Sequence, residues 1–211
     1  MSLVKLIAQA DERGLAASGL ACLDRCLPLL AGAIEEADVL RPLWVGVVGG
    51  ETDWTVRLAA SRDALDAAVG PDGASGVTAV LVRTMLGSAP SEWAAEPLRT
   101  WADTCSVVAL EIHQTLDVVD RSGDAGAETG AAERLARCRE EAADVTEAAD
   151  GAQSTDGVGP LVAGELRRQI RVLEILAGTS GAAGVRQAMD LSYEGQRVVR
   201  AVVSRRARAR S

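Results

Sequence analysis

His113 and Asp117 are the residues whose types and spacing come nearest to acid–base chemistry. They lie four positions apart, which puts both side chains on one side of a helix, one turn from each other. Asp117 would then orient the imidazole ring and raise its basicity, as in a nucleophile–His–acid arrangement. No Gly-x-Ser-x-Gly elbow accompanies the pair. We therefore favour a half-buried histidine paired with Asp117 over a catalytic one.

His113 is also the only histidine in the chain. This count excludes mechanisms that need two histidines, such as di-iron sites with paired Glu-x-x-His motifs and HExxH zinc sites. It leaves the cysteines and the carboxylates as possible metal ligands.

The four cysteines are spaced for helix packing rather than for zinc. Cys22 and Cys26 lie one turn apart, whereas Cys105 and Cys138 fall on two separate predicted helices. Structural zinc sites usually take their ligands in pairs from tight Cys-x₂₋₄-Cys turns. We predict four reduced thiols in the core of the protein.

Two glycine motifs do not form a nucleotide site. The runs at 46–49 and 178–181 lack the lysine of a phosphate-binding loop, and Lys5 is the only lysine in the chain. No strand is predicted before a Gly-x-Gly-x-x-Gly motif either. The sequence predicts no cofactor.

Two pairs of carboxylates remain as a candidate metal site. Asp117 and Asp120 are three residues apart near the end of one predicted helix, and Glu141 and Asp144 have the same spacing in the next. If the two pairs faced each other, they could hold Mg²⁺ for a diphosphate substrate. Solvated acidic helix faces also produce this spacing by chance.

This arrangement resembles that of the all-α nucleoside triphosphate pyrophosphohydrolases, which carry Glu-x-x-Glu and Glu-x-x-Asp on successive helices. The resemblance covers fewer than thirty residues, and it departs from the family pattern. Asp replaces both glutamates of the first helix, and the doubled Glu140-Glu141 precedes the second pair instead of the first. The resemblance implies a Mg²⁺-dependent hydrolase acting on a nucleotide or another diphosphate through Asp117, Asp120, Glu141 and Asp144.

The elements that must position these residues are predicted to be helices. The organising stretch is 96–121, where apolar residues recur at steps of three or four: Leu98, Trp101, Cys105, Val108, Ile112, Leu116 and Val119. The same periodicity, with capping or glycine signals, predicts further helices at 3–10, 15–37 with a kink at Pro28, 38–47, 52–69, 77–86, 131–149, 161–177 and from 185 onward. We expect an all-α fold, a compact single-domain bundle of about seven to nine helices.

Composition agrees with one helical domain over residues 1–211. Phe is absent and Trp occurs four times, so the core must be largely aliphatic. We expect mobile joints near 70–76, 121–131 and 150–160 and a basic tail at 204–211. The first apolar run is broken at Gln9, and no stretch approaches the roughly 18 apolar residues of a membrane span. A soluble, cytoplasmic protein without a membrane contact is expected.

Charge is distributed unevenly along the chain. Residues 164–211 hold ten arginines and four acidic residues, whereas the net charge of the whole chain is −8. A basic tail that binds nucleic acid is one reading. Arginines at a helix C-terminus that pair with acidic helices are the reading we favour, because no aromatic residue interleaves with the arginines.

The sequence therefore favours a non-enzymatic protein-interaction module, a regulator, adaptor or inhibitor of a protein partner. The alternative is the Mg²⁺-dependent hydrolase described above. We also expect a homodimer, formed by apolar surface around Leu173, Val199 and Val203 and by contact between the basic segment and the acidic segment of a second copy.

Overall fold

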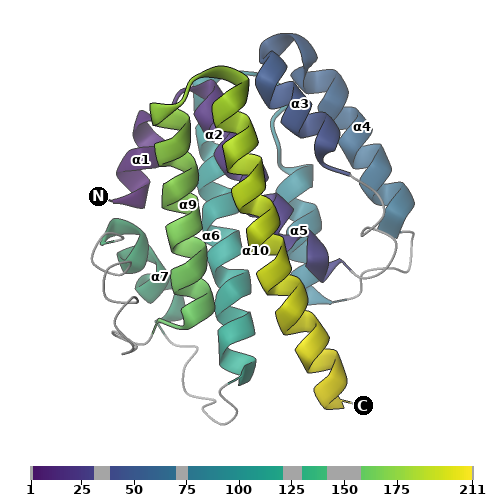
Figure 1. Cartoon of the computed structure of the whole chain (residues 1–211), viewed down its shortest axis with the longest axis vertical. Helices are drawn as coiled ribbons and strands as arrows, with labels where there is room; N and C mark the ends of the chain where they lie inside the picture. Colours follow the sequence, from purple (N-terminus) through teal and green to yellow (C-terminus); the bar gives the residue numbers. More distant parts are fainter. Residues whose placement is uncertain (1, 31–38, 70–75, 121–129, 142–157, 211) are drawn as a thin grey trace.

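The protein is an all-α bundle, as predicted, in a computed structural model that describes residues 2–30, 39–69, 76–120, 130–141 and 158–210. Within these ranges the chain forms nine α-helices and one 3-10 turn and no strand. The elements are α1 (Leu3–Gln9), α2 (Glu12–Cys26), η1 (Leu27–Leu29), α3 (Arg41–Gly49), α4 (Glu51–Val69), α5 (Val77–Gly87), α6 (Ala95–Asp120), α7 (Ala131–Glu140), α9 (Pro160–Gly178) and α10 (Gly181–Arg210) (Figure 1).

Helix α2 lies at the centre of the bundle. Asp11 caps its first turn by accepting a hydrogen bond of 2.7 Å from the Gly14 amide. From Gly14 to Cys26 every residue is buried, because α6, α9 and α10 surround the helix. A kink was predicted at Pro28. Instead, α2 ends at Cys26 and the chain forms the 3-10 turn η1, because the proline has no N–H for the next α-helical hydrogen bond.

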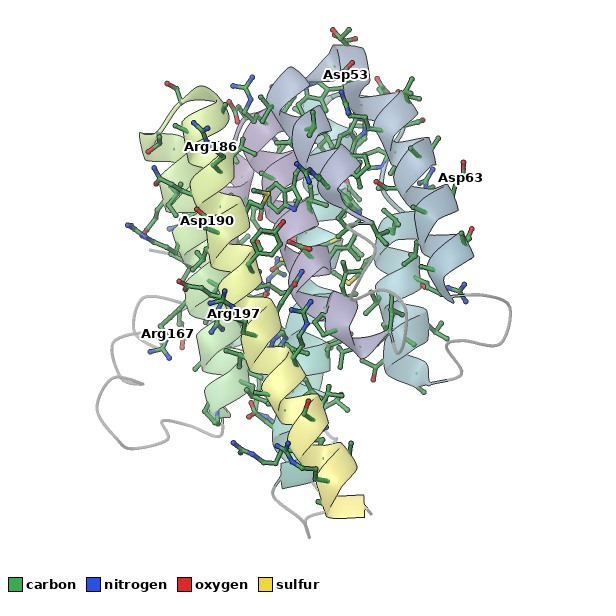
Figure 2. All side chains as sticks on the ribbon, turned by 45° about the vertical axis from the view of Figure 1, so that its right-hand side comes forward. Asp53, Asp63, Arg167, Arg186, Asp190 and Arg197 are labelled. Carbon is green, nitrogen blue, oxygen red and sulfur yellow. The ribbon has the colours of Figure 1, made fainter. Side chains whose placement is uncertain are left out.

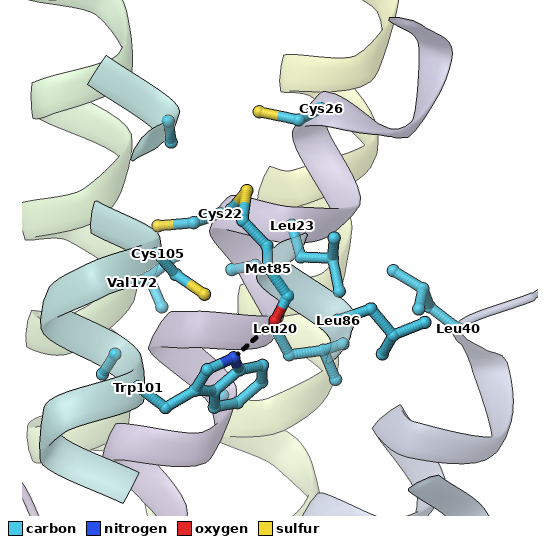
Figure 3. Packing of buried hydrophobic residues seen from close by; sticks show 14 of the residues in the cluster. Leu20, Cys22, Leu23, Cys26, Leu40, Met85, Leu86, Trp101, Cys105 and Val172 are labelled. Carbon is cyan, nitrogen blue, oxygen red and sulfur yellow. Dashed lines mark hydrogen bonds between the residues drawn. The ribbon is translucent and has the colours of Figure 1, made fainter. Parts of the chain in front are cut away.

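Helix α6 is the long helix predicted from residues 96–121, and it packs most extensively against α2. Its stripe is buried as expected from Leu98 through Leu116, with Val108 partly buried. Trp101 is 2% exposed and donates from Nε1 to the Met85 carbonyl oxygen at 2.8 Å (Figure 3). Its ring lies so close to Gly19 of α2 that a side chain there would displace it.

Helices α3 and α4 form a tight pair joined at Gly50. Gly50 has φ of 71°, a left-handed conformation that favours glycine. Residues 44–48 had the composition of either a buried strand or a helix, and the predicted helix is confirmed. Trp54 of α4 points into the core, where its ring meets those of Trp93 and Trp101 edge to face at centroid distances of 5.3 and 5.9 Å.

Helices α9 and α10 form an antiparallel pair, and both pack against α2 (Figure 1). The connection between these helices was predicted to span residues 178–184, but it is shorter, because α10 already begins at Gly181. Gly184 lies so close to the Thr179 carbonyl that a Cβ there would clash. A short connection is possible because glycine lets the two helices approach at this turn.

Several predicted boundaries fall outside the described residues. Helix α7 ends at Glu140, with Glu141 as its C-terminal cap, earlier than the predicted 131–149 helix, and residues 142–149 of that prediction lie outside the described residues. The predicted joints near 70–76, 121–131 and 150–160 lie mostly outside as well. Among the helices that are described, none is both long and apolar enough to cross a membrane.

Candidate functional site

His113 is sealed inside the bundle, with only 2% of its surface exposed. Its Nδ1 lies 2.7 Å from the Ala109 carbonyl oxygen, and a carbonyl can only accept, so Nδ1 carries a proton. Its Nε2 lies 3.7 Å from Oε2 of Glu165, which reaches it from α9. The acidic neighbour of His113 is therefore Glu165 and not Asp117, and the ring is buried rather than half-buried as the sequence had suggested.

Asp117 has a different task, because it caps α9 from the side. Its two carboxylate oxygens accept hydrogen bonds from the backbone amides of Leu161 and Val162 at 3.2 and 3.0 Å. Those amides have no partner inside their own helix, and a negative charge at this end is favoured by the helix dipole. Gly159 leaves the room that the carboxylate needs, since a Cβ there would overlap it. Asp117 thus joins the end of α6 to the start of α9.

The four candidate magnesium ligands do not come together in the part of the chain that is described. Asp117 is engaged at α9, and Asp120 is the last residue of α6. Glu141 is an exposed residue at the C-terminal cap of α7, and Asp144 lies outside the described residues. Among described side chains, no group of three or more His, Cys, Asp or Glu residues could hold a metal ion.

A buried ion pair occupies the centre of the bundle instead. Arg25 of α2 donates from Nε to Oε2 of Glu165 at 2.7 Å and from Nη2 to Oε1 at 2.6 Å. Both side chains have no exposed surface. Gln169, one turn further along α9, donates to the same carboxylate at 2.9 Å and accepts from the Ser106 hydroxyl of α6 at 2.6 Å. Three helices are thereby linked by one polar network.

The network keeps both charges. Burial alone would raise the pKa of the Glu165 carboxyl, but the Arg25 guanidinium and the hydrogen bonds to the carboxylate hold it below its ordinary value. Burial alone would lower the pKa of Arg25, and the Glu165 carboxylate raises it above its ordinary value. The pair is ionised at neutral pH and closed to solvent. Such a pair fixes how helices pack, and a substrate cannot reach it.

The fold makes room for Arg25 by placing a glycine opposite it. Gly195 lies in the middle of α10, and a Cβ built there would come within 2.7 Å of Cγ of Arg25. In the sequence, the only sign of this close approach is a glycine inside an otherwise helical pattern. Neither Arg25 nor Glu165 was singled out from the sequence, because 140 residues separate them and each is one charge on an otherwise apolar or mixed helix.

The thiols also lie in the core. Cys22 and Cys26 of α2 and Cys105 of α6 have no exposed surface (Figure 3). Cys138 of α7 is 7% exposed. Burial raises the pKa of the Cys22 thiol to about 12 and raises those of the other three. Because the thiolate is the form that acts as a nucleophile or binds a metal, these protonated thiols are unreactive at neutral pH.

A shallow groove of about 290 Å³ lies between the start of α2 and the end of α9. Its walls include the apolar side chains of Leu6, Leu173 and Leu176. The titratable side chain at its edge, Asp11, is engaged as the cap of α2. The groove therefore lacks a set of converging polar groups that would orient a small ligand.

The outer surface carries large apolar side chains in an unexpected place. The sequence pointed to Leu173, Val199 and Val203, but Leu173 and Val199 are buried and Val203 is partly buried. The exposed large apolar side chains of the described residues all belong to α3, α4 and α5: Val45 (43%), Val48 (38%), Val56 (74%), Val77 (81%) and Val80 (54%). We refer to the outward sides of α3 and α4, with Val45, Val48 and Val56, as the valine face.

Comparisons of the chain with protein-family models, with curated proteins and with solved structures found no match.

Proposed function

We propose that this protein is a non-enzymatic helical interaction module that regulates, recruits or inhibits a protein partner through the valine face. The observation that carries the proposal is the exposure of Val56, which is 74% exposed in the second turn of α4, a helix whose opposite side is core. Val45 and Val48 add exposed β-branched side chains on the adjoining helix. A contiguous apolar patch of more than a few hundred Å² on a protein surface commonly marks a binding site.

The polar groups of the described residues support the same reading. The two residues that the sequence offered as catalytic candidates, His113 and Asp117, are sealed in the core or already engaged. His113 and Glu165 are buried with Arg25 at the centre of the bundle, and Asp117 caps α9. An enzyme needs such groups at a surface or pocket where a substrate can meet them.

Affinity capture with matched variants tests the proposal. The wild-type chain and Val56→Asp would be used to capture proteins from a lysate of the source cells. We expect a specific partner to be retained by the wild type and lost with Val56→Asp. Ala183→Asp is the matched control, because Ala183 is an exposed residue of α10 and belongs to neither α3 nor α4. A partner retained equally by all three chains would argue against this surface.

The hydrolase reading predicts a different result. Thermal unfolding would be followed with and without Mg²⁺ and a panel of nucleoside diphosphates and triphosphates. A ligand that binds only the folded state raises its stability, by about 2.7 kcal/mol at a hundredfold excess over Kd. We expect no shift. A reproducible upward shift that requires both Mg²⁺ and a nucleotide would overturn the interaction module in favour of the enzyme.

A further inference from the structure

The end of helix α10 concentrates positive charge. Residues 195–211 hold six arginines and no acidic residue, whereas residues 1–194 hold the other 16 basic residues and all 30 acidic ones. The net charge of −8 thus divides into +6 on this segment and −14 on the rest of the chain. Charge separated in this way favours an anionic partner at the basic end.

The last turns of α10 are open to solvent. Figure 2 shows Arg186 and Asp190 in the first half of the helix and Arg197 further along it. Beyond Arg197 the helix runs past the start of α9 (Figure 1). The exposed residues of these turns are Ser204, Arg205, Ala207, Arg208 and Ala209.

One side of this segment is used within the fold. Val199 is buried, and Val202 and Val203 are partly buried against the core. Arg206 lies on the same side, where it donates to the Leu116 carbonyl oxygen at the end of α6. These residues hold α10 on the bundle.

The opposite side of the segment carries exposed arginines. Arg197 precedes Arg206 by nine residues, about two and a half turns, so the two side chains leave the helix on opposite sides. Arg197, Arg205 and Arg208 are exposed.

Two of these arginines are not neutralised by a neighbour. Within the described residues, Arg197 and Arg205 form no ion pair, so the pairing with acidic helices that the sequence favoured is not found for them. Glu194, the acidic residue nearest to Arg197 along the helix, interacts electrostatically with Arg168 of α9. A partner can therefore meet the charges of Arg197 and Arg205 without displacing an ion pair.

We propose that Arg197, Arg205 and Arg208 bind the phosphate backbone of a nucleic-acid duplex. Arg197 and Arg208 are eleven residues apart, which places them on one side of the helix about 17 Å from each other. A duplex presents one phosphate charge per about 1.7 Å of its axis, so several phosphates lie within reach of a segment of this length. Guanidinium groups bind phosphate in a two-pronged geometry. Contacts of this kind position a protein on a duplex without reading its sequence.

Other anionic partners need features that this segment lacks. A helix that lies in a membrane surface has large apolar side chains beside its basic side, whereas the valines of this segment pack on the bundle. Single-stranded nucleic acids stack their bases on aromatic side chains, and residues 195–211 contain none. Protein interfaces are centred on aromatic and other large side chains. Apart from Arg205, the exposed residues between Arg197 and Arg208 are Ala201, Ser204 and Ala207.

The experiment is fluorescence anisotropy of a labelled DNA duplex and of an RNA duplex of the same length, titrated with the full-length chain at about 50 mM and about 200 mM salt. The variants are Arg197→Gln, Arg205→Gln and the triple Arg197→Gln/Arg205→Gln/Arg208→Gln chain. Arg186→Gln is the matched control, because Arg186 is an exposed residue of the same helix near its start. Vesicles that contain phosphatidylserine, poly-glutamate and single-stranded DNA are the competing probes. Circular dichroism confirms that each variant is folded.

Three phosphate contacts on DNA give a slope of log K against log salt of about −2.7, so the affinity of the wild type and the control should fall about fortyfold between the two salt concentrations. Each single substitution should reduce that slope by about 0.9, and the triple variant should lose binding. Binding to either duplex supports the proposal, and the tighter of the two identifies DNA or RNA as the source of the phosphates.

Three results overturn the proposal. The first is a wild type that binds neither duplex at tens of micromolar in low salt. The second is a triple variant that binds as the wild type does, or an Arg186→Gln chain weakened as much as the triple variant. The third is tighter binding to the vesicles, to poly-glutamate or to the single strand, each of which would replace the duplex as the partner.

This surface is separate from the valine face, and the two can be tested apart. Val56→Asp should bind a duplex as the wild type does, and loss of binding in that variant would overturn the placement on α10. The triple variant should still capture a protein partner through Val56. A chain that binds a duplex but captures no partner would support the inference and remove the proposed function.

Discussion

Arg25 and Glu165 lie 140 residues apart in the sequence and meet in a two-pronged ion pair, with Nε–Oε2 and Nη2–Oε1 distances of 2.7 and 2.6 Å and no exposed surface on either side chain. The pair is held by further hydrogen bonds from Gln169 and, through it, from Ser106. A buried pair of this kind is costly to break and contributes little compared with an apolar pair of the same shape.

The first prediction separates those two effects. Arg25→Met or Glu165→Leu alone should lower the free energy of unfolding by about 3–5 kcal/mol, because each leaves an uncompensated charge in the core. The double variant should recover much of that loss. Urea denaturation measures all three. Arg57→Met, which removes one partner of an exposed pair, is the control and should cost less than about 1 kcal/mol. A double variant as unstable as the sum of the single variants would contradict this account.

The second prediction concerns acid. The folded-state pKa of Glu165 is below its ordinary value, so between that value and about 4.3 the unfolded chain binds more protons than the folded one. The stability contributed by Glu165 is complete above about pH 4.3 and is lost as the pH falls through its folded pKa. Unfolding free energy should decline with acid in that window, and less steeply in the Arg25→Met/Glu165→Leu double variant. Equal slopes for the two chains would show that other carboxylates dominate.

The third prediction uses Gly195. Alanine inside a helix usually stabilises it relative to glycine, by about 0.5–1 kcal/mol. Gly195→Ala should instead destabilise the protein, since the new Cβ would push on the Arg25 side chain. Gly178→Ala is the matched control, because a Cβ there meets no atom within 4 Å. Thermal unfolding of both variants checks the contrast, and a Gly195→Ala chain more stable than the wild type would contradict the tight approach.

The fourth prediction concerns Trp101. Trp101→Ala should cost about 3–5 kcal/mol, the usual range for emptying a large aromatic site. Trp93→Ala should cost less, because Trp93 is only partly buried. Chemical denaturation followed by far-UV circular dichroism measures both. A loss below about 1 kcal/mol for Trp101→Ala would mean that the neighbouring helices close over the site.

The fifth prediction concerns the thiols. In the native protein Cys22, Cys26 and Cys105 should resist a thiol reagent at pH 8, because burial keeps them protonated and out of reach. Reaction should follow unfolding in denaturant. Ala183→Cys, which adds an exposed thiol, is the positive control and should react at once. Rapid labelling of a native core thiol would show that the contact between α2 and α6 opens.

The sequence predicted those features that depend on the residues of a single helix. The stripe from Leu98 to Leu116 predicted the position and inward side of α6, because helical periodicity is a local property. The Leu173 and Val199 side chains were expected at the surface and are buried, because burial depends on which helices cover a stripe. Periodicity on one helix does not specify its neighbours.

The polar residues were less predictable for the same reason. Asp117 was grouped with His113 and with Asp120 because these residues are close in the sequence. The structure gives it backbone amides at 161 and 162 as partners, which no local pattern indicates. The pairing of Arg25 with Glu165 was equally invisible, since its physical cause is the crossing of α2 and α9 in space.

The contact of Trp54 with Trp93 and Trp101 gives the protein an internal optical probe. Three of the four tryptophans lie together, where Trp54 of α4 contacts Trp101 of α6 and Trp93 of the segment before α6. Tryptophan fluorescence therefore reports mainly on this contact. Far-UV circular dichroism instead averages over every helix. If the two signals change together as denaturant is added, the bundle unfolds as one cooperative unit. If fluorescence changes first, the α3–α4 pair can separate while the central helices remain folded.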